Sequence, residues 1–187
     1  MLDSQQPILF ESSNMQKYLN LNIFKGIKLR TEFDSIDRTL LSLLQREVVQ
    51  PLAKLAAAVG LSASPCWRRV QRLEKLGVIK ERVALLDRRK LGLNLEVFVE
   101  VRFSRDQPDS LQNFEEAIRA APEVLECFML MGQVDFLVRV VARDGDDYER
   151  FLRQKLAILP GVRDIKSSIA LSTVKSTTVL PLAHLED

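Results

Sequence analysis

The sequence is poor in the residues that build metal centres and most catalytic sites. Its 187 residues include two cysteines, Cys66 and Cys127, and a single histidine, His184, close to the end of the chain. This set is too small for a metal site of the usual ligand count. The seven glycines are dispersed, so the sequence has no phosphate-binding loop. We therefore predict neither an enzyme nor a metal protein, and no cofactor.

Long apolar runs are also missing. No stretch approaches the roughly 18 consecutive apolar residues of a membrane span, and no basic-then-apolar leader opens the chain. A content of 47% hydrophobic and 28% charged residues excludes a disordered or disulfide-rich class. The length fits one large domain or two small ones. We expect a cytoplasmic protein without a membrane partner.

Charge is nearly balanced over the whole chain but not within its parts. Residues 34–92 hold 12 Lys/Arg against 6 Asp/Glu, a net +6, whereas residues 93–187 hold 11 against 16, a net −5. This split favours a basic module that binds a polyanion, joined to an acidic module with another task. Chance scatter of surface charge is the alternative.

Helical periodicity begins after residues 1–32, which form an N-terminal extension to which we assign no role. The pattern predicts three helices. The first has Ile36, Leu40, Leu43 and Leu44 on one face, the second runs from Pro51 to Gly60, and the third runs from an N-cap at Ser64 to Gly77. The segment Val78–Leu86 is expected to be a strand. Residues 33–92 are therefore predicted to form a winged helix-turn-helix domain with its linker.

The third predicted helix has an apolar face of Cys66, Val70 and Leu73, with arginines beside it. Such a helix fits the major groove of double-stranded DNA, and its N-terminal amides can bind phosphate. The residues expected to contact DNA are Ser62, Ser64, Pro65, Trp67, Arg68, Arg69 and Arg72.

Two points on this helix stay open. Trp67 either packs against the neighbouring helix, which we favour, or contacts a sugar or a thymine methyl. The arginines could instead be a solvated face that forms i,i+4 pairs, although Glu74 could serve only part of it. Cys66 is interpreted as a small core residue.

The second half alternates strands and helices. The strands are predicted at 95–103, 124–131, 135–142 and 162–173, and the helices from Pro108 to Ala121 and over 144–159. This order predicts an α+β protein, with an antiparallel βαββαβ (ferredoxin-like) domain over 93–187. We expect its exposed sheet face to be apolar, through Phe98, Cys127, Met129, Val138 and Val140, and hence to form a homodimer.

From about Phe33 to Leu182 the sequence resembles the Lrp/AsnC (feast/famine) transcriptional regulators. The motifs that carry the resemblance are Asp37-Arg38-x-Leu40-Leu41, Leu61-Ser62-x-Ser64-Pro65-Cys66-Trp67-Arg68-Arg69-Val70-x-Arg72-Leu73-Glu74, Gly77-Val78-Ile79, Gly132-x-x-Asp135-Phe136-Leu137 and Leu159-Pro160-Gly161-Val162. Each motif is weak alone, but their order and spacing together are specific.

The resemblance implies a DNA-binding domain joined to a ligand-binding and oligomerisation domain. Members form dimers that assemble further, commonly into octamers, and bind small effectors, typically amino acids. The effector pocket lies between dimers near the Gly-x-x-Asp hairpin. In this sequence it implies Met131, Gly132, Gln133, Val134 and Asp135, with Ser168 as a weaker candidate.

Alternatives to this interpretation remain at two levels. The hairpin could be an ordinary turn in which Gly132 permits a positive φ and Asp135 caps the turn. The whole chain could be a stand-alone amino-acid-sensing and oligomerisation protein that binds DNA only non-specifically.

Overall fold

The computed structural model describes residues 33–46, 51–104 and 110–185. The predicted extension, residues 1–32, lies outside these ranges. The described residues form two compact units: a helical unit of residues 33–80 with 180–185, and a sheet unit within residues 81–179. The predicted division at residue 92 stays a prediction, but it placed the end of the chain in the second domain, whereas the contacts group this segment with the helical unit.

The helical unit contains the three predicted helices, α2 (Ser35–Leu44), α3 (Leu52–Ala58) and α4 (Ala63–Lys75). The side chain of Asp34 caps α2 by accepting a 2.8 Å hydrogen bond from the backbone N–H of Asp37. Fully or nearly fully buried side chains from all three helices form one core, namely Leu40, Leu41, Leu55, Ala56, Cys66, Val70 and Leu73. The apolar faces predicted for the first and third helices are therefore confirmed.

The start of α4 differs from the prediction by two residues. The helix begins at Ala63 with Ser62 as N-cap, so Ser64 and Pro65 lie inside the first turn. Proline is tolerated there because the first backbone N–H groups of a helix have no intrahelical partner. The N-cap position of Ser64 was therefore wrong.

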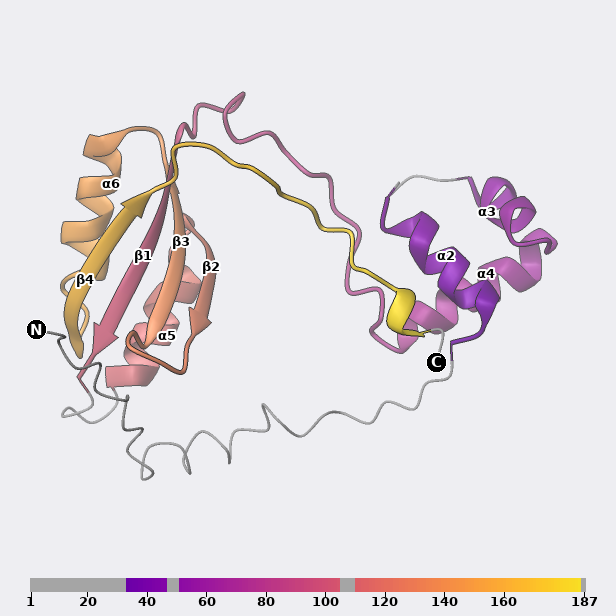
Figure 1. The fold of residues 1–187 in the computed structure, drawn as a ribbon, viewed down its shortest axis with the longest axis horizontal. Helices are drawn as coiled ribbons and strands as arrows, with labels where there is room; N and C mark the ends of the chain where they lie inside the picture. The colour runs from indigo at the N-terminus through magenta and orange to yellow at the C-terminus, as the bar shows by residue number, and fades with distance from the viewer. Residues whose placement is uncertain (1–32, 47–50, 105–109, 186–187) are drawn as a thin grey trace, which may run out of the picture. The chain divides into compact units, whose positions relative to one another are not determined.

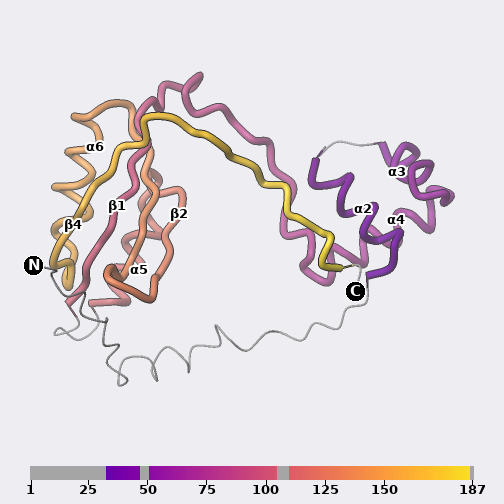
Figure 2. The backbone as a smooth tube through the Cα atoms, viewed as in Figure 1, coloured from indigo at the N-terminus to yellow at the C-terminus, as the bar shows by residue number. Residues whose placement is uncertain are grey.

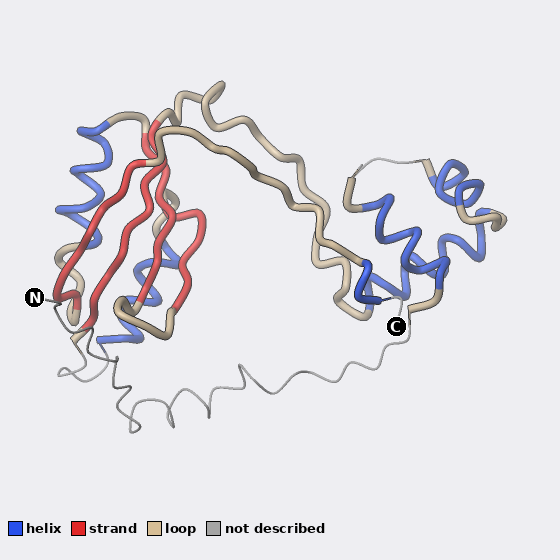
Figure 3. Tube along the Cα trace, in the orientation of Figure 1, coloured by secondary structure: helices blue, strands red, loops and turns tan. Residues whose placement is uncertain are grey.

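The wing strand predicted over Val78–Leu86 is also wrong. The segment has no strand hydrogen bonding and is drawn as loop in Figure 3. Its apolar side chains remain exposed, with Leu85 and Leu86 at 73% and 75%. An apolar run needs a partner strand to become β-structure, and the described part of the chain supplies none. The helical unit is thus a helix-turn-helix without a strand pair.

The C-terminal segment completes the helical unit. The side-chain amide of Gln45 and the backbone of Leu180 exchange two hydrogen bonds, of 3.1 Å and 2.9 Å. Nη1 of Arg38 donates to the carbonyl of Leu185 at 3.0 Å, within a short 3-10 helix at Ala183–Leu185. Leu182 packs against the helical core. The unit is therefore built from both ends of the described chain.

The sheet unit has the predicted order of strands and helices. Its elements are β1 (Leu95–Phe103), α5 (Ser110–Ala120), β2 (Val124–Met129), β3 (Phe136–Ala142), α6 (Gly145–Phe151), a π-helical turn at Leu152–Leu156 and β4 (Val162–Ile169). The strands lie side by side in the order β2-β3-β1-β4, all antiparallel (Figures 1 and 2). The predicted ferredoxin-like topology is confirmed.

The expected apolar composition of the open sheet face is wrong. Val138 and Val140 are fully buried in the core with side chains of α5 and α6, and both helices lie on one face of the sheet. Cys127 pairs with Val138 and Met129 with Phe136, so these side chains lie on the helical side too. Only Phe98 of the five lies on the open face, which carries the charged residues Glu96, Glu100, Glu126 and Arg139 instead. Alternation separates two faces, but in a strand as apolar as β3 it does not say which face the helices cover.

The tight packing of Gly161 gives a test of this unit. Gly161 has a φ of +86°, and a Cβ there would lie 2.3–2.8 Å from the Phe103 ring; Gly92, at +83°, has open space. We expect Gly92→Ala to lower the free energy of unfolding by about 1 kcal/mol for the backbone conformation alone. Gly161→Ala should cost about 1–3 kcal/mol more because of overpacking. Urea denaturation measures both, and equal losses would contradict the packing.

Candidate nucleic-acid interface and ligand region

The polar side of α4 is exposed, and its apolar side is held by the helical core. Cys66 lies at 0% exposure, and burial raises the pKa of its thiol, as expected for the predicted core residue. Ser62, Ser64, Arg68, Arg72 and Lys75 are exposed, Pro65 and Arg69 are partly buried. α4 therefore presents hydroxyl and guanidinium groups along one side.

Trp67 does not take the packing role that we favoured. Its side chain is 53% exposed on α4. An indole in this position can contact a sugar or a thymine methyl, which was the other role open to it.

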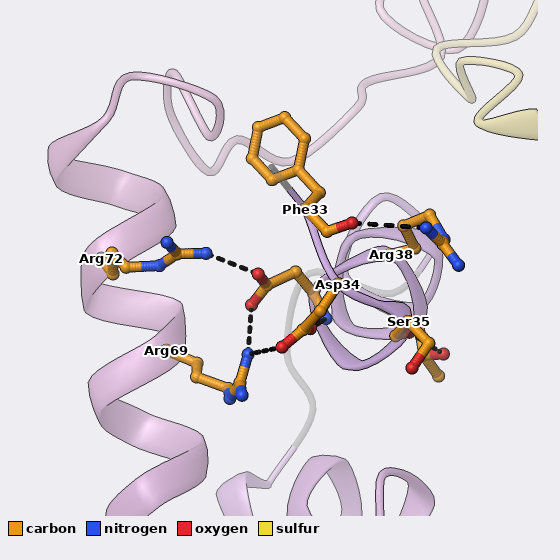
Figure 4. A network of polar contacts seen from close by, with 8 residues as sticks. Phe33, Asp34, Ser35, Arg38, Arg69 and Arg72 are labelled. Carbon is orange, nitrogen blue, oxygen red and sulfur yellow. Dashed lines mark hydrogen bonds and ion pairs between the residues drawn. The ribbon is translucent and has the colours of Figure 1, made fainter. Parts of the chain in front are cut away.

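Two arginines of α4 bind a buried carboxylate on α2. Nη1 of Arg69 lies 2.9 Å from Oδ1 of Asp37, and Nη2 of Arg72 lies 2.5 Å from Oδ2 of the same residue. The Asp37 side chain is 1% exposed, whereas the Arg72 side chain is 47% exposed. Figure 4 shows both arginines extending from their helix toward the carboxylates at the start of α2. One carboxylate thus contacts two successive turns of α4.

Asp34 extends this cluster to the surface. Its Oδ2 lies 2.7 Å from the same Nη1 of Arg69, while its Oδ1 caps α2. The N–H of Asp37 lowers the pKa of Asp34, slight burial opposes this, and Arg69 lowers the pKa further. Asp34 therefore stays ionised at neutral pH and shares Arg69 with Asp37.

These ion pairs were missed by the sequence analysis, which considered only Glu74 as a partner for the arginines. In the structure Glu74 accepts a hydrogen bond from Gln71. The true partners lie more than 30 positions earlier in the sequence. A signal was present: Asp37 adjoins the apolar stripe of the first helix, where a buried carboxylate requires a cationic partner.

Arg68 differs from its two neighbours. It is exposed and forms no ion pair with any residue in the described ranges. Together with Arg69, Arg72, Asp34 and Asp37 it lines an open hollow of about 390 Å³ on the helical unit. The hollow thus has one unpaired guanidinium beside two that are paired to carboxylates.

The hairpin between β2 and β3 contains the residues expected at the effector pocket. Met131, Gly132 and Gln133 are exposed, and Val134 and Asp135 are partly buried. The carboxylate of Asp135 accepts a 2.9 Å hydrogen bond from the backbone N–H of Phe103, and its own N–H donates to the carbonyl of Val101 at 3.0 Å. Asp135 therefore joins the hairpin to the end of β1, which is a larger structural role than capping the turn.

Ser168 is not brought to this hairpin within one chain. It is exposed on β4 and pairs with Phe98, whereas the hairpin begins beyond the pairing of Val101 with Phe136, on the other side of β1. The remaining predicted residues, 131–135, are contiguous and lie together.

A buried ionic cluster crosses the open face of the sheet. Glu96 is 5% exposed and contacts Nε of Arg139 at 2.7 Å and Nη2 of Arg88 at 2.9 Å. Burial by itself would raise the pKa of Glu96, but the hydrogen bonds and charges of Arg139 and Arg88 outweigh it and hold the pKa below its usual value. Arg139 also contacts Glu126 at 3.1 Å.

Two further findings concern other classes of site. Within the described ranges, no group of three or more His, Cys, Asp and Glu side chains could hold a metal ion. No helix in this part of the chain is both long and apolar enough to cross a membrane.

A helix-turn-helix with a cationic exposed face, followed by a ferredoxin-like unit with a conspicuous hairpin, defines the class of two-part transcriptional regulators. The chain belongs to one family of that class, Lrp/AsnC. Residues 33–74 match the AsnC-type helix-turn-helix domain, and residues 96–180 match the Lrp/AsnC ligand binding domain. The family resemblance inferred from the sequence is confirmed. Because the relatives are transcriptional regulators, the prediction that the chain is not an enzyme agrees with them.

Similar proteins cover nearly their whole length. A glutamate uptake regulatory protein of Zymomonas mobilis is 37% identical over 83% of this chain and 94% of its own. The DNA-binding transcriptional activator DecR of Escherichia coli K12 is 39% identical over 80% and 98%. Among solved structures, regulator NMB0573 of Neisseria meningitidis in complex with L-Met is 36% identical with a TM-score of 0.79, over 82% of this chain and 99% of its own. An AsnC family regulator of Agrobacterium tumefaciens is 41% identical with a TM-score of 0.76, over 81% and 99%.

The Glu96 cluster predicts a pH dependence of stability. Because the folded-state pKa of Glu96 is below its usual value of 4.5, its contribution is present above pH 4.5 and is lost as the pH falls through the folded-state pKa. Glu96→Gln should lower the free energy of unfolding by about 1–3 kcal/mol at pH 7, and the difference from wild type should shrink in acid.

The control is Glu100→Gln on the same strand, whose contact with Lys166 is 3.9 Å long. It should change stability by less than about 0.5 kcal/mol. Urea denaturation at pH 7 and pH 4 measures both variants. A Glu96→Gln deficit that is independent of pH would contradict the charged role of Glu96.

Proposed function

We propose that this protein is a cytoplasmic, sequence-specific DNA-binding regulator whose DNA affinity responds to an amino acid or a related small effector bound between dimers. The observation that carries the proposal is the exposed side of α4, with Arg68 and Arg72, backed by the core residues Cys66, Val70 and Leu73. A rigid helix with these two sides can lie in a major groove.

In the proposed complex, the start of α4 binds the DNA backbone. Its first N–H groups and the hydroxyls of Ser62 and Ser64 are exposed and suited to phosphate. Arg68, with no ion pair in the described ranges, is the best placed to read a guanine edge. Arg69 has the least to offer DNA because one of its nitrogens is already shared by two carboxylates.

We propose a homodimer that assembles further, as family membership implies, up to an octamer. Two α4 helices in a dimer would enter successive major grooves about one helical turn apart. The charged open face of the sheet does not support the apolar contact that we first expected, so a dimer that uses it would have to pair Glu96, Arg139 and their neighbours with complementary charges.

For the effector, the hairpin of residues 131–135 supports an amino acid. Backbone amides at a turn suit an α-carboxylate, and carbonyls or a carboxylate suit an α-amino group. The L-Met complex of the Neisseria meningitidis relative supports the same ligand class. Ser168 would reach such a ligand only from another subunit, because its own chain places it on the opposite side of β1 from the hairpin.

The alternative is a sensing and oligomerisation protein with only non-specific DNA affinity. The pairing of Arg69 and Arg72 with carboxylates is the observation in its favour, since it lowers the charge that α4 presents. Competition between the upstream region of the protein's own gene and random DNA, at two salt concentrations, separates the two functions.

Arg68→Ala tests the DNA interface. If Arg68 reads a base, the variant should bind specific DNA about 1–3 kcal/mol more weakly, with little change in stability, because the side chain has no ion pair to lose in the described ranges. Fluorescence anisotropy measures the affinity. Arg153→Ala, which removes an exposed arginine from the sheet unit, is the matched control. Unchanged affinity in both Arg68→Ala and Arg72→Ala would contradict the proposed interface.

Asp135→Asn tests the effector region while keeping an oxygen that can accept the N–H of Phe103. The effector is first found as the one of the twenty amino acids that raises the melting temperature of the wild-type protein. We expect Asp135→Asn to lose that shift and the effector's influence on DNA binding, while the unliganded DNA affinity is kept. An intact response would remove Asp135 from the pocket.

A further inference from the structure

The cluster between α2 and α4 assigns a role to a residue that does not itself reach the surface. We propose that Asp37 is a positioning residue for DNA binding: it holds the guanidinium of Arg72 so that its remaining N–H groups contact a phosphate of the DNA backbone. This inference rests on the proposed DNA-binding function and deepens it.

The burial of the two partners gives the direction of the arrangement. Asp37 is 1% exposed and lies behind Arg72, whose side chain is 47% exposed. Of the five N–H donors of a guanidinium, Arg72 uses those of Nη2 on Asp37 and makes no other hydrogen bond with the residues that the structure describes. A phosphate can therefore approach the outer edge of Arg72 without displacing the carboxylate behind it.

The charges show that position matters more here than net charge. Asp34 and Asp37 neutralise Arg69 and Arg72, so Arg68 alone gives the hollow its excess positive charge. The advantage of the pair must then come from preorganisation, because a long arginine side chain already fixed by folding loses less freedom on binding. A mobile arginine would pay that entropy when it binds DNA.

The same carboxylate also fixes the rotation of the helix. Asp37 contacts Arg69 and Arg72, which are three residues and about one helical turn apart on α4. Both bonds end on the first turn of α2, where Asp34 caps the helix and contacts Arg69 as well. Arg68, next to Arg69 in sequence, is thereby held at a defined angle to the solvent.

The opposite role for Asp37 is sequestration, in which the carboxylate competes with phosphate for Arg72. The geometry favours positioning, because a competitor would have to lie on the outer side of the guanidinium, and Asp37 lies on the inner side. The two roles predict opposite effects of removing the negative charge, which makes them separable by experiment.

The experiment is a double-mutant cycle on DNA binding with Asp37→Asn, Arg72→Ala and the double variant, in the full-length chain. Affinity for the upstream region of the protein's own gene is measured from 50 to 300 mM salt. If Asp37 positions Arg72, each single variant should lose about tenfold in affinity and about one unit of salt slope. The double variant should be no weaker than Arg72→Ala.

Asp34→Asn is the matched control, because Asp34 contacts Arg69 but not Arg72. It should leave the salt slope unchanged. Arg72→Lys is a second test that does not alter the buried site: lysine keeps the charge but lacks the planar fork, so it should bind DNA almost as weakly as Arg72→Ala. Binding of Arg72→Lys like wild type would overturn the proposal, even if Asp37→Asn fails to fold.

Other outcomes also overturn it. Tighter binding and a steeper salt slope in Asp37→Asn would mean sequestration. An equal loss from Asp37→Asn in the wild-type and Arg72→Ala backgrounds would mean that Asp37 acts only through the stability of the fold. Failure of the wild-type protein to prefer its own upstream region over random DNA would instead overturn the proposed function, and this inference with it.

Discussion

The structure depends most on one buried carboxylate. Asp37 is almost fully enclosed, and a charge in that position is tolerated only because Arg69 and Arg72 supply matching charges and hydrogen bonds. The three residues join the first helix of the helical unit to the helix that faces solvent. Removing either side would leave uncompensated charge. The interaction therefore couples the stability of the unit to the way in which α4 presents its arginines.

The arginines of α4 consequently have different tasks although they are neighbours in sequence. Arg69 is bound by two carboxylates and serves the fold, Arg72 is divided between the fold and solvent, and Arg68 faces solvent. The chain also returns to the helical unit after completing the sheet unit, through the contacts of Leu180, Leu182 and Leu185. Two segments of chain, rather than one linker, thus join the units.

Much of the fold could be predicted because local periodicity carries it. The helices around Leu40 and Val70 and the strand Leu95–Phe103 follow from patterns of 3.6 and 2 residues. The failures all involve partners distant in sequence. Val78–Leu86 has an apolar pattern but no strand to pair with, and the side of the sheet on which Val138 lies was decided by strand register. The partners of Arg69 and Arg72 lie more than 30 residues away, so no spacing rule could identify them.

The central claim is that the exposed side of α4 is the surface that meets DNA. Trp67 is the only tryptophan of the chain, lies on α4 and is half exposed, so its fluorescence reports on that surface alone. On titration with the upstream DNA of its own gene, we expect the emission of Trp67 to change and its quenching by iodide to fall, both reversibly with added salt. DNA binding detected by anisotropy while Trp67 keeps its emission and its accessibility to iodide would contradict the account.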